Sequence, residues 1–93
     1  MDLENFMTIY RSINKKNYCI ETGPIRFIDD HNNRYCPITL VCKHVTGKYF
    51  DIGTWYFAAT EIGISYDDAK NIACSADNMF NCDRLYSELL KDI

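Results

Sequence analysis

Apolar residues recur at three- and four-residue spacing over the start of the chain. The residues on this stripe are Leu3, Phe6, Met7, Tyr10 and Ile13. The spacing predicts an amphipathic helix, and Asp2 supplies the side-chain oxygen that caps a first turn. The helix should end near Asn14, where Lys15 and Lys16 would suit the negative end of its dipole.

Shorter stretches bounded by turn residues come next. Gly23-Pro24 separates residues 18–22 from residues 25–28, and a polar run at 29–33 leads to Arg34-Tyr35. We expect strands at 18–22, 25–28 and 34–35, with a hairpin turn at 29–33. They would form an antiparallel sheet of two or three strands, which is too small to be stable alone and must pack on helices.

Helical spacing returns at Pro37. The stripe that follows consists of Ile38, Val41, Cys42 and Val45. Pro37 suits the first position of a helix because an N–H has no intrahelical partner there, and Gly47 suits the position after the end. We therefore expect a helix that begins at Pro37 and stops before Gly47.

Three more helices are expected in the second half of the chain. Thr54 is placed to cap a helix that Gly63 ends. Ser65, with Asp68 three residues later, resembles a capping box for a helix through about residue 76. A final amphipathic stripe consists of Leu85, Tyr86, Leu89, Leu90 and Ile93.

These elements predict an α+β fold. An N-terminal helix and a small two- or three-stranded antiparallel sheet would pack on a C-terminal bundle of about four short helices, which contains a helix-turn-helix-like pair. The chain has 93 residues, of which 47% are hydrophobic and 14% aromatic. This composition is ample for the core of one compact domain over residues 1–93.

Residues 58–72, AATEIGISYDDAKNI, have the pattern of a helix-turn-helix. Ala59 supplies the small residue where two helices cross, Gly63 makes the turn, and Ala69 and Ile72 pack back on the first helix. In a DNA-binding protein, the exposed positions of such a unit approach base edges and phosphates. Those positions are Ser65, Tyr66, Asp67, Lys70 and Asn71.

The charges of this unit oppose DNA binding. Residues 55–77 carry four acidic side chains and one basic side chain. Asp67 and Asp68 would lie beside a polyanion with one charge per ~1.7 Å of axis. Over the whole chain, residues 1–50 have seven Lys/Arg against five Asp/Glu, and residues 51–93 have three against eight. We interpret the helix pair as core scaffold that, if it recognises anything, binds a protein before DNA.

Three consecutive aromatic residues, Trp55, Tyr56 and Phe57, follow Tyr49 and Phe50. Consecutive helical positions point about 100° apart, so one face of a helix cannot hide all three rings. Either the domain wraps this helix on several sides, or an aromatic side chain remains for homodimerisation or a partner protein. The partner-binding candidates are Trp55, Tyr56, Tyr66, Asp67 and Asp68.

Basic residues of the first half suggest a different surface. They are Lys15, Lys16, Arg26 and Arg34, joined by Lys43 and Lys48 if the sheet folds beside the helix that starts at Pro37. Such a patch would contact a phosphate-bearing ligand or nucleic acid, with Tyr18 or Tyr35 stacking on a base. Scattered, solvated charges are the alternative interpretation.

Five cysteines are present, an odd number, and the first residues lack the pattern of a secretory signal. We expect a reduced, cytoplasmic protein with mostly buried free thiols. No apolar run approaches the ~20 residues that span a bilayer, so no membrane association is expected.

Cys36 is the one candidate nucleophile. It precedes a predicted helix whose dipole would lower the pKa of the thiol, and His44 is near in sequence. The simpler interpretation places Cys36 at a strand end and Cys42 in the core. These two thiols lie about 240° apart around a helix, and no chelating spacing is present, so no metal site is expected.

Three functional hypotheses follow. The first is a small non-enzymatic protein that binds and occludes a protein partner, without a cofactor. Its compact, acidic and motif-poor character resembles small phage and mobile-element proteins that inhibit host defence or nucleic-acid-handling proteins. The second is a nucleic-acid or nucleotide binder that uses the basic hairpin or the helix-turn-helix-like pair. The third is a small cysteine-dependent enzyme, for which no base, orienting carboxylate and oxyanion donor can be assembled.

Overall fold

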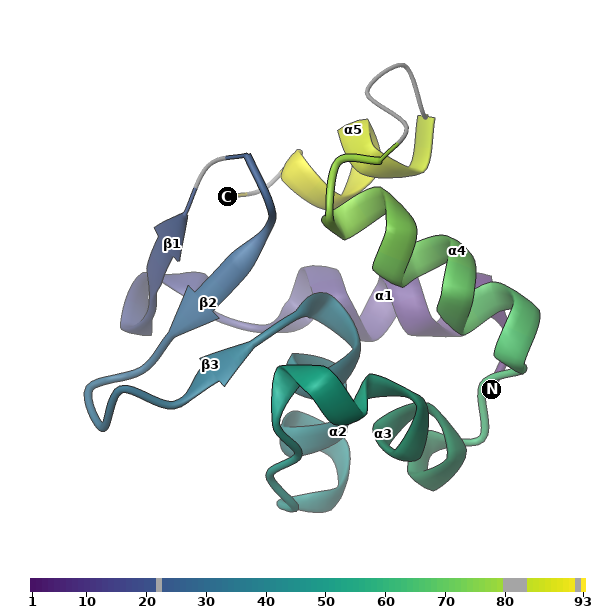
Figure 1. The fold of residues 1–93 in the computed structure, drawn as a ribbon, viewed down its shortest axis with the longest axis horizontal. Coiled ribbons are helices and arrows are strands. Elements are labelled where there is room, and N and C mark those ends of the chain that lie inside the picture. The colour runs from purple at the N-terminus through teal and green to yellow at the C-terminus, as the bar shows by residue number, and fades with distance from the viewer. Residues whose placement is uncertain (22, 80–83, 92) are drawn as a thin grey trace.

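The computed structural model describes residues 1–21, 23–79, 84–91 and 93. Its elements in chain order are α1 (Leu3–Ser12), η1 (Lys15–Asn17), β1 (Cys19–Glu21), β2 (Arg26–Ile28), β3 (Arg34–Tyr35), α2 (Pro37–Thr46), η2 (Ile52–Thr54), α3 (Trp55–Ile62), α4 (Tyr66–Ala76) and α5 (Arg84–Leu90). In Figure 1 the sheet lies to the left, α1 passes behind, and α2 to α5 follow one another from the bottom to the top of the view. This arrangement confirms the predicted α+β fold.

The sheet has the order β1-β2-β3, with both pairs antiparallel. Phe27 of β2 lies opposite Tyr35 of β3, and both side chains are buried against the core. Asp29 holds the turn between β2 and β3, because its carboxylate accepts hydrogen bonds from the Asn33 backbone N–H and the Tyr35 hydroxyl, both at 2.9 Å. β1 and β2 each begin one residue later than predicted, and Thr22 lies outside the described residues.

The first helix, α1, begins as predicted. The Asp2 carboxylate accepts a hydrogen bond from the Asn5 backbone N–H at 2.8 Å, which satisfies one of the free N–H groups of the first turn. Phe6 and Tyr10 lie on the predicted stripe and are buried. The Tyr10 hydroxyl donates to the Leu89 carbonyl oxygen at 2.9 Å. This bond ties α1 to α5 across almost the whole length of the chain.

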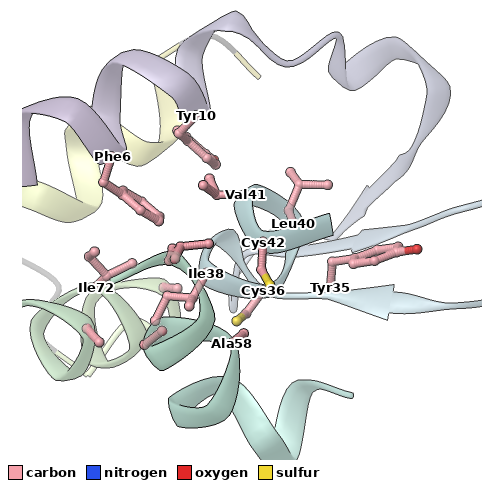
Figure 2. Close-up of a cluster of buried hydrophobic side chains, with 14 of the residues drawn as sticks. Phe6, Tyr10, Tyr35, Cys36, Ile38, Leu40, Val41, Cys42, Ala58 and Ile72 are labelled. Carbon is pink, nitrogen blue, oxygen red and sulfur yellow. The ribbon is translucent and has the colours of Figure 1, made fainter. Parts of the chain in front are cut away.

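The helix α2 forms the centre of the core, as Figure 2 shows. Every residue from Pro37 to Cys42 is buried, because α1, α3, α4 and the sheet all contact this helix. Leu40 is therefore buried although it lies off the predicted stripe. Val45 was placed on that stripe and is 48% exposed, because the last turn of α2 lies at the surface. Gly47 ends the helix as predicted, in the left-handed conformation with φ of 77°.

The helices α3 and α4 form the predicted helix-turn-helix shape. Gly63 makes the turn with φ of 74°, and the Ser65 hydroxyl caps α4 by accepting from the Asp68 backbone N–H at 3.2 Å. The predicted side-chain cap at Thr54 is wrong, because its hydroxyl donates to the Asp51 carbonyl oxygen at 2.8 Å within η2. The buried inner faces of the two helices consist of Ala58, Ala59, Ile62, Ala69 and Ile72.

The short helix α5 is held by α1 and by the β1–β2 turn. Arg11 pairs with Glu88 at 2.5 Å, and the Tyr86 hydroxyl donates to the Gly23 carbonyl oxygen at 3.1 Å. Ile93 was predicted to share the apolar stripe of this helix. It is 44% exposed instead, because α5 ends three residues before it.

Candidate functional site

Four aromatic side chains at α3 and the start of α4 form one continuous row. Tyr66 stacks on Trp55 with ring centroids 6.0 Å apart, Trp55 meets Tyr56 edge-on at 5.9 Å, and Tyr56 contacts Phe57 at 4.4 Å. We call these four residues the aromatic row. Tyr56 is 45% exposed, Phe57 51% and Tyr66 63%, whereas Trp55 is partly buried against the core.

The aromatic row faces outward because α3 turns its small residues inward. Ala58 and Ala59 are buried, and their methyl side chains allow α2 and α4 to approach α3 closely on that side. Positions 55 to 57 point about 100° apart on a helix, so three neighbouring rings cannot share the inner face. The prediction that one helix face cannot hide all three is confirmed. Phe57 was absent from the predicted site residues, although this same spacing applies to it.

The row is continuous with unpaired acidic side chains at the start of α4. Asp67 is exposed and Asp68 half-buried in the first turn, where the helix dipole favours negative charge. Among the described residues, neither carboxylate forms an ion pair. Four other exposed or half-buried carboxylates of the described chain, those of Glu21, Glu61, Asp77 and Glu88, each have an Arg or Lys partner. The start of α4 therefore presents negative charge with which no Arg or Lys side chain of the described residues pairs.

Lys15 does not belong to a basic surface. It is buried, its ammonium donates to the Tyr10 carbonyl oxygen at 2.6 Å, and its Nζ lies 4.1 Å from the centre of the Tyr10 ring. The expected phosphate contact at Lys15 is wrong, because the side chain closes the C-terminal end of α1 instead. Its neighbour Lys16 is exposed.

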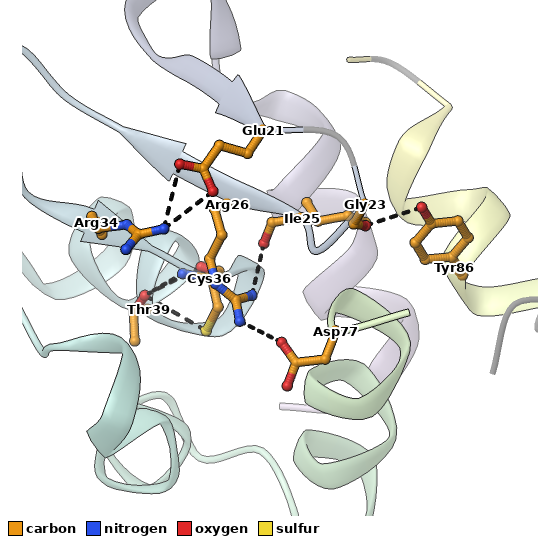
Figure 3. Close-up of polar contacts among 9 residues, drawn as sticks. All are labelled: Glu21, Gly23, Ile25, Arg26, Arg34, Cys36, Thr39, Asp77 and Tyr86. Atoms are coloured by element: carbon orange, nitrogen blue, oxygen red, sulfur yellow. Dashed lines mark hydrogen bonds and ion pairs between the residues drawn. The ribbon is translucent and has the colours of Figure 1, made fainter. Parts of the chain in front are cut away.

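Arg26 and Arg34 lie on one side of the sheet, but each has an acidic partner. Arg26 pairs with Asp77 at 2.5 Å, and Arg34 pairs with Glu21 at 3.1 Å, as drawn in Figure 3. Both line a shallow hollow together with the carboxylates of Glu21 and Asp51. The structure brings these two predicted phosphate contacts together, yet the acidic groups around them offset their charge.

The other members of the predicted basic surface are likewise engaged. Lys43 donates to the Gly47 carbonyl oxygen at 2.9 Å, and Lys48 pairs with Glu61 at 3.1 Å. Tyr35, one of two rings expected to stack on a base, is buried and contacts Tyr18 and Tyr49 edge-on. It cannot accept a base on its face without rearrangement of the core.

The thiol of Cys36 is not activated. It is buried, and this burial raises the pKa of the Cys36 thiol despite the hydrogen bonds that Thr39 contributes. The expectation that the dipole of α2 lowers this pKa is wrong, because desolvation of the thiolate outweighs it. His44 lies eight residues later on the exposed last turn of α2, about 12 Å along the helix axis. Cys42 is buried in the core as predicted, whereas Cys19 is exposed and Cys82 lies outside the described residues.

In the part of the chain that the structure describes, no helix has the length and apolar character that a bilayer span requires, and no three His, Cys, Asp or Glu side chains are grouped as metal ligands. No family model, curated protein or solved structure matches the chain. Function is therefore inferred from the surface of the protein itself.

Proposed function

We propose that this chain is a small protein-binding module without enzymatic activity, and that it binds its partner through the aromatic row and the acidic start of α4. The observation that carries this proposal is the exposure of three rings, Tyr56 (45%), Phe57 (51%) and Tyr66 (63%). Tyr56 contacts Phe57 directly, and Trp55 links Tyr56 to Tyr66. Contiguous exposed apolar surface on a small protein is typical of an interaction site. Tyr, Trp and Phe are also the residues enriched at the centres of protein interfaces.

The aromatic row is also organised before any partner binds. Trp55 packs against the core and contacts both Tyr66 and Tyr56, so it restrains the rings on either side of it. Side chains that are already ordered lose less conformational entropy on association. The buried inner face of α3 holds the backbone beneath them. These features favour recognition by a rigid surface rather than by a loop that folds on binding.

Charge indicates the chemistry of the partner. Asp67 and Asp68 are unpaired among the described residues, and they adjoin the row at Tyr66. A partner surface with Arg or Lys side chains would be complementary to this arrangement, whereas a phosphate backbone would be repelled. Proteins that handle nucleic acids have such basic grooves. A domain seated in one would inhibit its owner by occlusion, which is the mode of action we propose.

Capture of partners with matched variants tests the proposal. Phe57→Ser removes an exposed ring of the row, and Asp67→Asn removes one unpaired charge. Met79→Ser and Asp30→Asn make the same kinds of change at exposed sites outside the row. A partner should be retained by the wild type and both controls, and lost by Phe57→Ser and by Asp67→Asn. The purified partner should then change the fluorescence of Trp55, the only tryptophan of the chain.

Other results would contradict the proposal. Binding that all four variants retain would show that the row is not the site. A homodimer in solution that Phe57→Ser dissociates would assign the row to self-association instead. Salt-sensitive binding of DNA or heparin that Arg34→Ala abolishes would favour the nucleic-acid alternative.

A further inference from the structure

We infer that the side chain with which the partner docks on the aromatic row is arginine rather than lysine, and this inference rests on the proposed function. Three observations carry it: the open face of the Tyr66 ring, the close spacing of the rings, and the unpaired carboxylate of Asp67. Each of these distinguishes a flat guanidinium from a compact ammonium group.

The Tyr66 ring is open on one side. Its other side stacks on Trp55, with centroids 6.0 Å apart and planes inclined by 27°, and the residue as a whole is 63% exposed. A planar cation can therefore extend the stack by one more layer on the outer face of Tyr66. Guanidinium groups stack on aromatic faces in this way, because they are planar and less strongly hydrated than ammonium groups.

The spacing of the rings opposes recognition of an ammonium group by a cage. Neighbouring centroids of the row are 4.4 to 6.0 Å apart, so each pair of rings is already in contact. A cage for an ammonium or methylated ammonium group needs rings that surround the cation on several sides, with space between them. The row instead offers the outer faces and edges of packed rings, which suit a flat group.

The Asp67 carboxylate supplies a hydrogen-bond acceptor for a guanidinium group that stacks on Tyr66. It follows Tyr66 directly in the first turn of α4, is exposed, and forms no ion pair among the described residues. A guanidinium stacked on a ring keeps its N–H donors at the edge of the stack, where they remain free to bond a carboxylate. An ammonium group is not planar, so it has no flat face for the ring with its N–H donors set apart at the edge.

Three short peptides of one design test the inference. Each has two test positions in a Gly/Ser background without aromatic residues, and these positions hold arginine, lysine or citrulline. Citrulline keeps the planar shape of arginine but carries no charge. The full chain is titrated with each peptide at low ionic strength, with Trp55 fluorescence and amide NMR shifts as independent readouts. We expect the arginine peptide to bind about fivefold more tightly than the lysine peptide, and the citrulline peptide more weakly than both.

Variants then identify the groups responsible. Tyr66→Leu removes the ring face but keeps an apolar side chain, so the ratio of arginine to lysine affinity should fall to about one, as read from the NMR shifts. Asp67→Asn should weaken both charged peptides, and the arginine peptide more than the lysine peptide, whereas the matched Asp30→Asn should leave both affinities unchanged.

Equal affinities for arginine and lysine in the wild type would overturn the inference, as would the absence of saturable binding by the arginine peptide. A ratio that Tyr66→Leu leaves unchanged would also overturn it. The proposed function is judged separately, by whether Phe57→Ser loses a captured partner, so failure of the arginine inference is distinguishable from failure of the interaction surface.

Discussion

The helices α2 and α3 pack against each other, and both are short and rich in apolar residues, yet they use those residues in opposite ways. In α2 every residue from Pro37 to Cys42 is buried. In α3 the two alanines and Ile62 are buried, and the larger rings of Tyr56 and Phe57 are about half exposed. Thus α3 has larger apolar side chains than α2, but it contributes its smaller apolar side chains to the core.

The burial of a side chain therefore depends on how many elements surround its helix, as well as on its own apolar character. The helix α2 contacts α1, α3, α4 and the sheet, whereas α3 packs mainly on α2 and α4. A helix with neighbours on fewer sides has an outer face, and the half-exposed aromatic residues on that face contribute less to the stability of the domain than fully buried ones. This contrast is the physical reason to assign α2 to the core and to propose the outer face of α3 as a recognition surface.

The largest loss of stability is expected in the buried first half of α2. Ile38→Ala should lower the free energy of unfolding by about 3 kcal/mol, because it leaves a cavity in a site that its neighbours cannot fill. The control is Val45→Ala on the exposed last turn of the same helix, which should cost less than about 1 kcal/mol. Urea unfolding measures both, and equal losses would contradict the assignment of the first half of α2 to the core.

A substitution on the inner face of α3 should give the next largest loss of stability. Ala59→Leu adds three carbon atoms where α2 and α4 meet α3, and we expect it to cost about 2 kcal/mol through overpacking. Thr60→Leu places the same side chain at the adjacent exposed position, where the cost should be within about 0.5 kcal/mol. Thermal unfolding distinguishes the two variants. If Ala59→Leu is as stable as the wild type, the helices are not closely packed at this point.

A substitution in the turn between α3 and α4 should give a smaller loss of stability. Gly63→Ala should cost about 1 kcal/mol, because φ of 74° is unfavourable for a residue with a Cβ. The added Cβ would lie 3.6 Å from the Met1 nitrogen, an ordinary contact, so the cost is conformational rather than steric. Gly53→Ala, where φ is not in the positive range and no atom lies within 4 Å of the added Cβ, is the matched control. Similar losses in both variants would mean that the left-handed turn is not the cause.

The smallest change in stability is expected on the aromatic row. Phe57→Ser should lower the free energy of unfolding by about 1 kcal/mol or less, because half of the ring is already in water. Met79→Ser, an exposed apolar residue outside the row, should behave alike in stability while retaining partner binding. A loss above about 2 kcal/mol for Phe57→Ser would place the row in the core and remove the basis for the contrast between α2 and α3.

Local features of the chain were predictable from sequence because they depend on nearby atoms. Asp2 and Ser65 cap the helices they precede, and Gly47 and Gly63 end helices with positive φ. Each depends on a hydrogen bond or a backbone conformation within a few residues. The starts of α1 and α4, the ends of α2 and α3 and the turn between α3 and α4 follow from such local rules.

Only the tertiary structure decided which of the expected surface groups are free. Lys15 is buried over Tyr10, Arg26 is paired with Asp77 fifty-one residues away, and Cys36 is desolvated in the core. The pairing of Arg26 and the burial of Cys36 depend on contacts between segments distant in sequence, which no local pattern specifies, whereas Lys15 folds back on a residue only five positions earlier. The sequence by itself determined the helices, the turns and the acidic, aromatic character of the second half. The packing of the chain determined that Asp67 and the aromatic row remain exposed, because no other element of the described chain covers the outer face of α3 or pairs with the Asp67 carboxylate.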